Sequence, residues 1–400
     1  MTRYLITILG NPPAQQGGFL KRTTYTIEDK PYERILFADA LTTHFKPDVV
    51  RILGTSGSCW HELLIELNAE IMADERVSQL EQAVRSDTAT QAMLNELTPL
   101  LNTLAPERKY ELRLIPYGYD DNTQVSILKT MAEGFSTQDE LLLDVTHGLR
   151  HLPMLALISA FYLRSVANVT VSGVYYAPYA TGGAQTQAVS LTGLMHLYDW
   201  VRALECMNKD GDFGIFEPLL DKENMRGDLL KKAAFLERQA YTPAAKNTLD
   251  TFDKLPTPEG ISAAAELFLP QLKKRIDWRI GPDRAEWEKR LARKYLDRRD
   301  YLRATQFAFE SLITREVIKA GGNAHKFQTS RDEAKKRLTQ LTLDQHLNPD
   351  DPHNFITLTH LGNSLAHGVR TYNPGSFVNS LLNNEDSMRK WLGNCLKPNL

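Results

Sequence analysis

The segment Asp144-Val145-Thr146-His147-Gly148 brings together three side chains that can take part in chemistry. It follows the apolar run Leu141–Leu143, so a buried strand is expected to deliver a carboxylate, a hydroxyl and an imidazole to its carboxyl end. Gly148 permits a tight turn, and Pro153 suits the first turn of a following helix. These groups either contact a ligand or cap the helix and satisfy buried backbone groups. The residue types alone leave both interpretations open.

Two further loops of small residues follow predicted strands. The first contains Gly10 and Asn11, and the second is Gly54-Thr55-Ser56-Gly57-Ser58. Small residues allow close backbone approach, and the helix that begins after the second loop directs its first N–H groups at that loop. Neither a GxGxxG sequence nor a Walker A lysine is present, so dinucleotide binding and Mg-nucleotide hydrolysis are unsupported. The alternative for the second loop is a helix start capped by Ser56 or Ser58.

Nothing in the sequence is typical of a metal site. The three cysteines are isolated, and the histidines show no HExxH spacing. We therefore expect no structural or catalytic metal and no cofactor.

The composition is that of a globular protein, with 42% hydrophobic and 24% charged residues in a chain of 400. This length predicts two domains or three. The net charge of −2 excludes a polybasic coat protein, so any nucleic-acid site must be local. The start of the chain has no signal-peptide pattern, and no apolar run approaches the roughly 20 residues of a membrane span. We expect a soluble, cytoplasmic protein without membrane contact.

The first half of the sequence alternates between apolar runs and helical patterns. The expected strands are Tyr4–Leu9, Val49–Leu53, Glu111–Ile115, Glu140–Val145 and Val169–Tyr176. The expected helices are Tyr32–Phe45, several pieces of Trp60–Leu104, Asp121–Ala132 and Leu152–Val166. This alternation predicts a Rossmann-like α/β domain with a parallel sheet and a ligand crevice beyond the carboxyl ends of its strands.

From about Leu191 onward, helical patterns replace the strands. The expected helices near the C-terminus are Arg299–Ala320, Ser330–Leu341, Phe355–His367 and Ser376–Leu396. We therefore predict an α/β domain over residues 1–190, a helical linker region over 191–290 and an all-α bundle over 291–400.

One stretch of the helical half is basic. Between Lys273 and Arg337 there are 19 Lys and Arg against 10 Asp and Glu. Such a run is either a solvated helix face or a surface that attracts phosphates.

The sequence around Asp144 resembles the DxTHG-motif family of CRISPR-associated CARF-domain proteins. The order of the motifs agrees as well, from Leu9-Gly10-Asn11 through Gly54-Thr55 to the helix around Trp200. This resemblance implies a homodimer or a higher homo-oligomer whose two CARF domains share one pocket for cyclic oligoadenylate, either tetra- or hexa-adenylate. The implied ligand-binding residues are Gly10, Asn11, Thr55, Ser56, Asp144, Thr146, His147 and Gly148.

The C-terminal bundle resembles the HEPN ribonuclease domain that members of this family carry. Asn363 and His367 fit the HEPN motif, but its arginine is missing. Four to six residues should separate the arginine from the histidine, and the three possible positions hold Gly362, Leu361 and His360. Arg370, if the helix continued, or His360, on the same helical face, would be the substitutes. Without this resemblance, His367 reads as a residue at a helix C-terminus that interacts favourably with the helix dipole.

The resemblance implies an endoribonuclease that cleaves single-stranded RNA without a metal and leaves a 2′,3′-cyclic phosphate. In this mechanism histidine moves the proton and arginine stabilises the phosphate. Because the arginine is missing, two alternatives stay open: a ring nuclease that cuts cyclic oligoadenylate in the CARF pocket, and a non-catalytic sensor with a degenerate HEPN domain.

Overall fold

The computed structural model describes residues 1–10, 22–178, 185–324, 329–370, 373 and 375–397. The chain forms two compact units, Met1–Met195 and His196–Leu400. Each unit has its own hydrophobic core. The further division at residue 290 stays a prediction.

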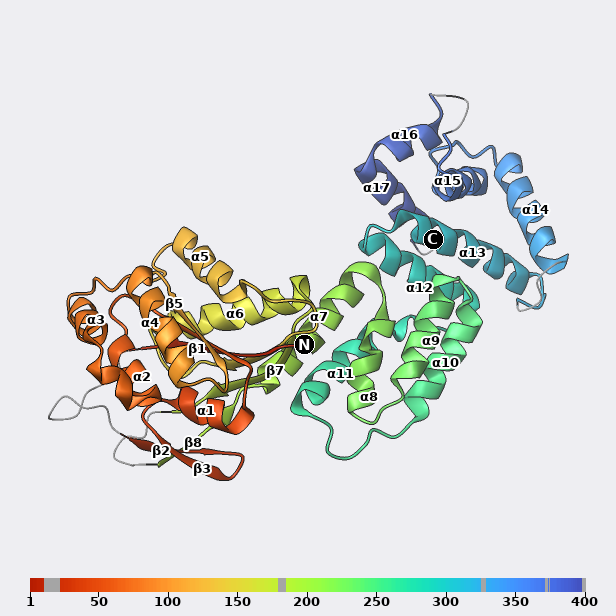
Figure 1. The fold of residues 1–400 in the computed structure, drawn as a ribbon. Helices are drawn as coiled ribbons and strands as arrows, with labels where there is room; N and C mark the ends of the chain where they lie inside the picture. Colours follow the sequence, from red (N-terminus) through yellow and green to blue (C-terminus); the bar gives the residue numbers. More distant parts are fainter. Residues whose placement is uncertain (11–21, 179–184, 325–328, 371–372, 374, 398–400) are drawn as a thin grey trace. The chain divides into compact units, whose positions relative to one another are not determined.

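A six-stranded sheet forms the centre of the first unit (Figure 1). Its order is β5 (Lys109–Leu114), β4 (Val49–Gly54), β1 (Arg3–Leu9), β6 (Glu140–Asp144), β7 (Thr170–Tyr176) and β9 (Val189–Ser190). The first five strands pair in parallel, and β9 pairs antiparallel with β7. The predicted α/β fold class with a parallel sheet is thus confirmed.

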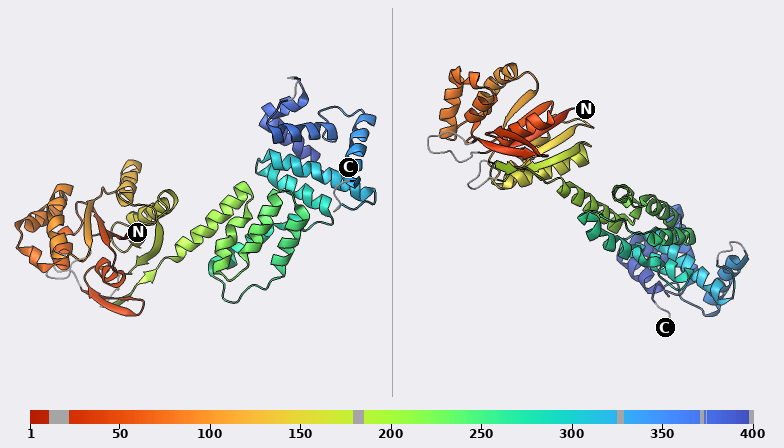
Figure 2. Two further views of the ribbon diagram at one scale, coloured as in Figure 1. Left: turned by 45° about the vertical axis from the view of Figure 1, so that its right-hand side comes forward. Right: turned by 90° about the horizontal axis from the view of Figure 1, so that it is seen from below.

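Helices cover both faces of this sheet, which explains why its strands are apolar on both sides. Alternate side chains of β1 enter two separate cores, with Leu5 and Leu9 in one and Ile6 and Ile8 in the other. On the first face lie α1 (Phe37–Phe45), α2 (Trp60–Leu67), η1 (Ala69–Ala73), α3 (Glu75–Arg85) and α4 (Gln91–Leu104). On the second lie α5 (Asp121–Ala132) and α6 (His151–Val166). Both views of Figure 2 show the sheet between these two sets of helices.

A smaller three-stranded sheet corrects one prediction. It consists of β3 (Lys30–Arg34), β2 (Thr23–Ile27) and β8 (Gln185–Gln187). Residues 32–34 were expected to begin a helix, but they belong to β3, and the helix α1 starts only at Phe37. The reason is the turn at Glu28 and Asp29, whose positive φ angles of 47° and 64° reverse the chain and pair β2 with β3.

Helices are the only regular secondary structure among the described residues of the second unit, as predicted for this part of the chain. Its helices are α7 (Gly193–Asp210), which begins in the first unit, η2 (Phe213–Phe216), α8 (Glu217–Lys222), α9 (Gly227–Arg238), α10 (Thr242–Lys254), α11 (Ala263–Arg275), η3 (Asp277–Arg279), α12 (Arg284–Asp297), α13 (Tyr301–Lys319), α14 (Thr329–Asp344), α15 (Phe355–His367), α16 (Phe377–Asn383) and α17 (Glu385–Cys395). The long helix α13 contacts α12, α14 and α15. This arrangement fixes the position of α15, which carries the predicted catalytic residues.

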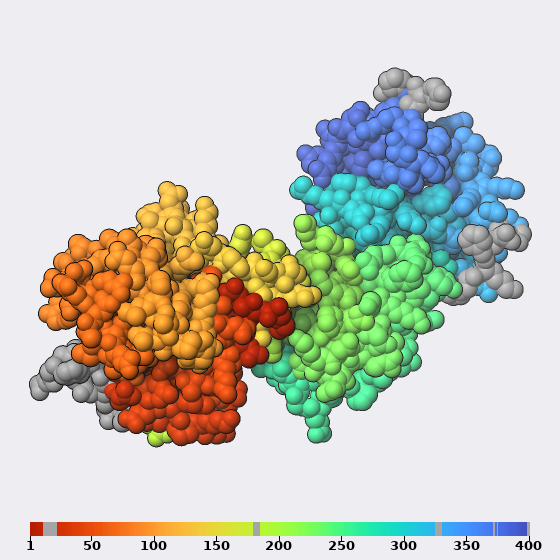
Figure 3. All heavy atoms as spheres, in the orientation of Figure 1, coloured from red at the N-terminus to blue at the C-terminus, as the bar shows by residue number. Residues whose placement is uncertain are grey.

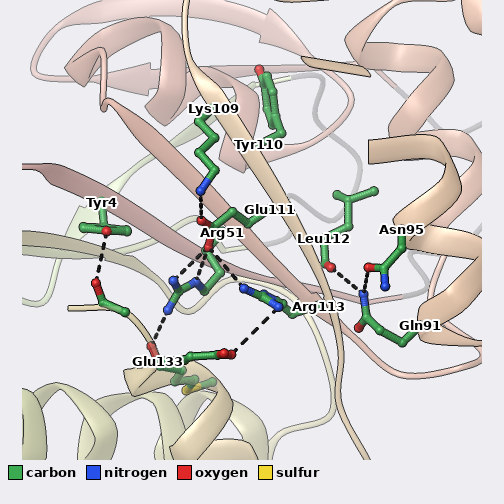
Figure 4. A network of polar contacts seen from close by, with 12 residues as sticks. Tyr4, Arg51, Gln91, Asn95, Lys109, Tyr110, Glu111, Leu112, Arg113 and Glu133 are labelled. Atoms are coloured by element: carbon green, nitrogen blue, oxygen red, sulfur yellow. Dashed lines mark hydrogen bonds and ion pairs between the residues drawn. The ribbon is translucent and has the colours of Figure 1, made fainter. Parts of the chain in front are cut away.

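A buried ion pair joins the first unit's sheet to α5 (Figure 4). Arg51 on β4 is only 2% exposed, and its Nε and Nη2 donate to Glu111 Oε2 over 2.9 and 2.8 Å. Its Nη1 donates to the Met131 carbonyl in the last turn of α5 over 2.9 Å. Burial alone raises the pKa of the Glu111 carboxyl, but hydrogen bonds from Lys109 and Arg51 outweigh it and leave this pKa below its ordinary value. The pair therefore holds the C-terminal end of α5 against the strands.

We expect Glu111→Ala to lower the free energy of unfolding by about 3–5 kcal/mol, because it leaves the Arg51 guanidinium buried without its carboxylate. Urea unfolding of the whole chain measures this. The matched control is Glu133→Ala, which removes an exposed carboxylate 3.8 Å from Arg113 and should change stability by less than about 1 kcal/mol. Equal losses in the two variants would contradict the role given to the buried pair.

Candidate functional site

The predicted ligand-binding loops meet at the carboxyl edge of the sheet. Neighbouring parallel strands β4, β1 and β6 end there at Gly54, Leu9 and Asp144. Gly10 lies so close to the next loop that a Cβ built on it falls 2.7 Å from the Gly148 nitrogen. The Gly10 carbonyl also accepts a hydrogen bond of 3.1 Å from Cys59 N–H. Three segments that are far apart in the sequence are thereby brought together, whereas Asn11 lies outside the described residues.

Asp144 is buried and shapes the turn of the DxTHG motif. Its carboxylate accepts hydrogen bonds from Thr7 Oγ1 at 2.7 Å and from the Thr146 N–H at 2.9 Å. Thr146 Oγ1 in turn accepts from the Ala177 N–H, at the end of β7, over 3.0 Å. Asp144 is therefore a positioning residue here, and it orients the two residues that follow it.

His147 presents a buried ring nitrogen with no hydrogen-bond partner among the described residues. This atom is Nε2, and the Cβ of the same residue lies 3.5 Å from a Cβ built on Gly10. Burial lowers the pKa of the imidazole, and the nearby Asp144 carboxylate opposes that shift without cancelling it. The ring is thus neutral near pH 7, and its Nε2 is a buried polar atom whose hydrogen-bonding capacity the described residues do not use.

Gly148 and the start of α6 provide backbone groups at the same edge. Gly148 is exposed, has a φ of +95°, and a Cβ built on it falls 2.6 Å from Ile8 Cγ2. A side chain is therefore excluded on both conformational and steric grounds. The first N–H groups of α6 receive no side-chain cap from Arg150, the residue at the N-cap. The Leu152 N–H already donates to the Leu149 carbonyl over 2.8 Å, and Pro153 has no N–H. Of the first three residues of α6, only His151 can therefore offer its N–H to an anion such as a phosphate.

The Thr55–Ser58 loop is held from within. Ser58 Oγ accepts from the Thr55 N–H over 2.9 Å and donates to the Leu9 carbonyl over 2.8 Å. The Trp60 indole N–H donates to the Thr55 carbonyl over 2.9 Å. Ser58 thus ties this loop to β1 and, like Ser56, does not cap α2, contrary to the capping alternative. Ser56 is half-buried, and its hydroxyl donates to the Asp87 carboxylate.

Sequence reasoning missed the loop after β5 as part of this edge. Tyr117 lies in this loop, and its hydroxyl donates to Asp87 Oδ1 over 2.6 Å, on the carboxylate that also holds Ser56. His151, the first residue of α6, contacts the Tyr117 carbonyl through Nε2 at 2.7 Å. The available signal was the aromatic sequence Tyr117-Gly118-Tyr119 directly after a strand that ends at the same edge.

The predicted catalytic residues of the second unit lie on α15. His360, Asn363 and His367 are all exposed, and the helix ends at His367 because Gly368 has a φ of +66°. Arg370 therefore does not continue the helix. Gly362, at the position of the missing arginine, faces α13, since a Cβ built on it falls 3.6 Å from Thr305 Cγ2.

A cavity of about 710 Å³ opens beside His360. Its other lining residues include His346, Asn354 and Phe377, whereas His367 is not among them. His360 and His367 share one helical face by their spacing, but only His360 borders this cavity.

Within the described ranges, no three His, Cys, Asp or Glu side chains come together as a metal site. The helices of the same residues include none with the length and apolar character needed to span a bilayer.

We expect the free energy of unfolding to fall as the pH drops below about 6.5, the ordinary value for histidine, because the unfolded chain accepts a proton that folded His147 resists. His147→Gln should remove part of this dependence, and His353→Gln, which changes an exposed histidine, should not. Urea unfolding between about pH 5 and pH 7 measures both. An unchanged pH profile for His147→Gln would show that the ring is not held neutral by burial.

The comparison with known proteins agrees with this geometry. The family model described as "CRISPR system endoribonuclease Csx1, CARF domain" matches residues 4–178, which contain all of the loops above. The chain is also similar to CRISPR-associated protein MJ1674 of Methanocaldococcus jannaschii, with 21% identity over 257 residues. That match covers 59% of this chain but only 40% of the relative. The first unit of this chain is therefore a CARF-type α/β domain over residues 4–178, the part that this family model matches.

Proposed function

We propose that two copies of this chain bind one cyclic oligoadenylate between their CARF domains, and that the bound ring switches on cleavage of single-stranded RNA by the helical unit. The observation that carries the proposal is the convergence of Gly10, Thr55–Ser58 and Thr146–Gly148 at one sheet edge. Backbone N–H groups and helix N-termini of this kind hold phosphates without a large basic excess. A net charge of −2 is therefore compatible with an anionic ligand.

An apolar stripe on α6 supports a two-fold dimer. Met154, Ile158, Tyr162 and Val166 recur every four residues and are between 43% and 69% exposed. Figure 3 shows α6, in yellow, at the surface of the first unit. Exposed apolar stripes of this kind mark interaction sites, and a two-fold interface uses the same patch on both subunits. Because α6 begins directly after the DxTHG loop, its pairing with a second α6 brings two such loops to one ligand.

We expect Ile158→Glu to weaken the dimer, since it introduces a charge at the centre of this stripe. Analytical ultracentrifugation measures the change as a shift from dimer to monomer. The control Ser78→Glu adds the same charge to an exposed position on α3, over the other face of the sheet, and should leave the dimer intact. A dimer that survives Ile158→Glu would exclude α6 from the interface.

RNA cleavage is proposed for the exposed face of α15. His367 would take the proton of the ribose 2′-hydroxyl as that oxygen attacks the phosphorus, and the 5′-oxygen would leave with a proton, giving a 2′,3′-cyclic phosphate. Asn363 lies one turn before His367, and His360 lies two turns before it. The protonated imidazole of His360 would donate the proton that the leaving 5′-oxygen takes. Arg370 remains a second candidate for the phosphate contact from outside the helix.

His367→Ala should lower the rate of RNA cleavage by about 10²–10⁴-fold while cyclic oligoadenylate binding stays intact. The assay follows a labelled single-stranded RNA in EDTA, with and without cyclic tetra- or hexa-adenylate, and identifies the product ends. His353→Ala, which removes an exposed histidine just before α15, is the control and should cleave normally. Undiminished cleavage by His367→Ala would remove His367 from the mechanism.

Two alternatives follow from the position of Gly362, where the motif arginine is absent. If the wild-type chain leaves RNA intact but converts the cyclic messenger to linear products, it is a ring nuclease. If it binds the messenger and cuts neither molecule, it is a sensor that acts through a partner.

A further inference from the structure

Two tyrosines and a histidine form a cluster of aromatic rings beside the proposed ligand site. We call this cluster the aromatic ledge, and it consists of Tyr117, Tyr119 and His151. The two tyrosine rings are parallel within 8°, with centroids 5.6 Å apart. The His151 ring lies 6.1 Å from Tyr119 at a tilt of 42°. Tyr119 is nevertheless 77% exposed, so most of its ring surface faces water. A large exposed aromatic side chain that is buttressed by other rings is suited to stacking on a flat ligand group.

Hydrogen bonds hold the ledge in place. The Tyr117 hydroxyl is anchored on Asp87, as described above. The Tyr117 carbonyl can only accept, so the proton of the His151 hydrogen bond must lie on Nε2.

The residues directly before and after Tyr119 are also held in fixed conformations. Gly118 has a φ of +76°, and a Cβ built on it falls 2.9 Å from Ile127 Cδ1. On the other side, Asp120 caps α5 with a reciprocal capping box to Thr123. The backbone of Tyr119 is therefore fixed before any ligand binds, which lowers the entropy lost on stacking.

The ledge lies next to two of the loops that converge at the sheet edge. Asp87 accepts from both Tyr117 and Ser56, so it links the ledge to the Thr55–Ser58 loop. His151 opens α6 directly after the DxTHG loop. The Tyr119 ring therefore lies on the same side of the sheet edge as a ligand whose phosphates are held by those loops.

We propose that Tyr119 is a stacking platform for one adenine base of the bound cyclic oligoadenylate. This inference rests on the proposed function. The loops offer groups suited to phosphate and sugar, whereas the ledge offers the aromatic surface that an adenine needs. Stacking accepts the face of any base. Tyr119 thus contributes affinity, and adenine selectivity must come from hydrogen-bonding groups such as His147.

The test compares Tyr119→Ala with Tyr119→Phe, which keeps the ring. We expect Tyr119→Ala to weaken binding of cyclic tetra- or hexa-adenylate by about 5- to 150-fold, the usual contribution of one stacked base, and Tyr119→Phe to stay within about threefold of wild type. Calorimetry measures both, with Tyr241→Ala as a matched loss of an exposed tyrosine from the second unit. An unchanged melting temperature confirms that the variants fold.

A second readout reports stacking itself. A cyclic tetra-adenylate carrying one 2-aminopurine should lose fluorescence on the wild-type chain and lose clearly less on saturated Tyr119→Ala. If wild type binds and Tyr119→Ala binds and quenches equally, the stacking role is wrong while the proposed function stands. If wild type binds no cyclic oligoadenylate, both fail together.

Discussion

The near-contact between the Gly10 and Gly148 backbones is the constraint on which the candidate site depends. No side chain fits at either position, since a Cβ on Gly10 meets the Gly148 nitrogen at 2.7 Å and a Cβ on Gly148 meets Ile8 at 2.6 Å. Only this approach lets the turn after β6 lie against the end of β1. The same strand end holds Ser58 through the Leu9 carbonyl, so three loops share one anchor. A methyl group at either glycine would separate the surfaces that are proposed to hold one ligand.

The charged and polar side chains of the first unit divide into two roles. The first role is structural. Buried side chains make hydrogen bonds that hold the fold together, namely those of Asp144, Ser58 and the Arg51–Glu111 pair. Three groups at the sheet edge are not used in this way: backbone N–H groups, the buried Nε2 of the neutral His147 ring and the exposed Tyr119 ring. A site of this kind recognises shape and phosphate position more than total charge. In the proposed function, the ligand can change the activity of the helical unit only if it binds one dimer arrangement more tightly than another.

The sequence predicted the first unit well where burial dictates the pattern. Near-continuous apolar runs identified all five parallel strands, and the bounds of α5 and α15 agree with the predicted ranges. The β2–β3 hairpin was missed, because Lys30–Arg34 is largely exposed and its strand state depends on pairing with β2. The contact between Gly10 and Gly148 depends on β1 and β6 being neighbours in the sheet, and the sequence pattern did not predict this strand order.

The roles of single side chains were harder to predict. Asp144 was expected as a ligand contact, yet its hydrogen bonds to Thr7 and Thr146 appear only once β1 and β6 are paired. The Tyr119 ledge depends on Asp87, which lies 32 residues before Tyr119, and on His151, which lies 32 residues after it. Neither residue belongs to a recognisable sequence motif. Among the predicted catalytic residues around α15, the sequence already showed that the motif arginine is missing. The structure adds that Gly368 ends the helix and separates Arg370 from it.

The central claim is that two identical chains hold one ring-shaped nucleotide between their DxTHG loops. Isothermal titration of the wild-type protein with cyclic tetra- and hexa-adenylate tests it most directly, because the stoichiometry reports how the ligand is shared. The account predicts saturation with one of these ligands at one ring for two chains. Saturation at one ring per chain, or no heat of binding with either ligand, would contradict it.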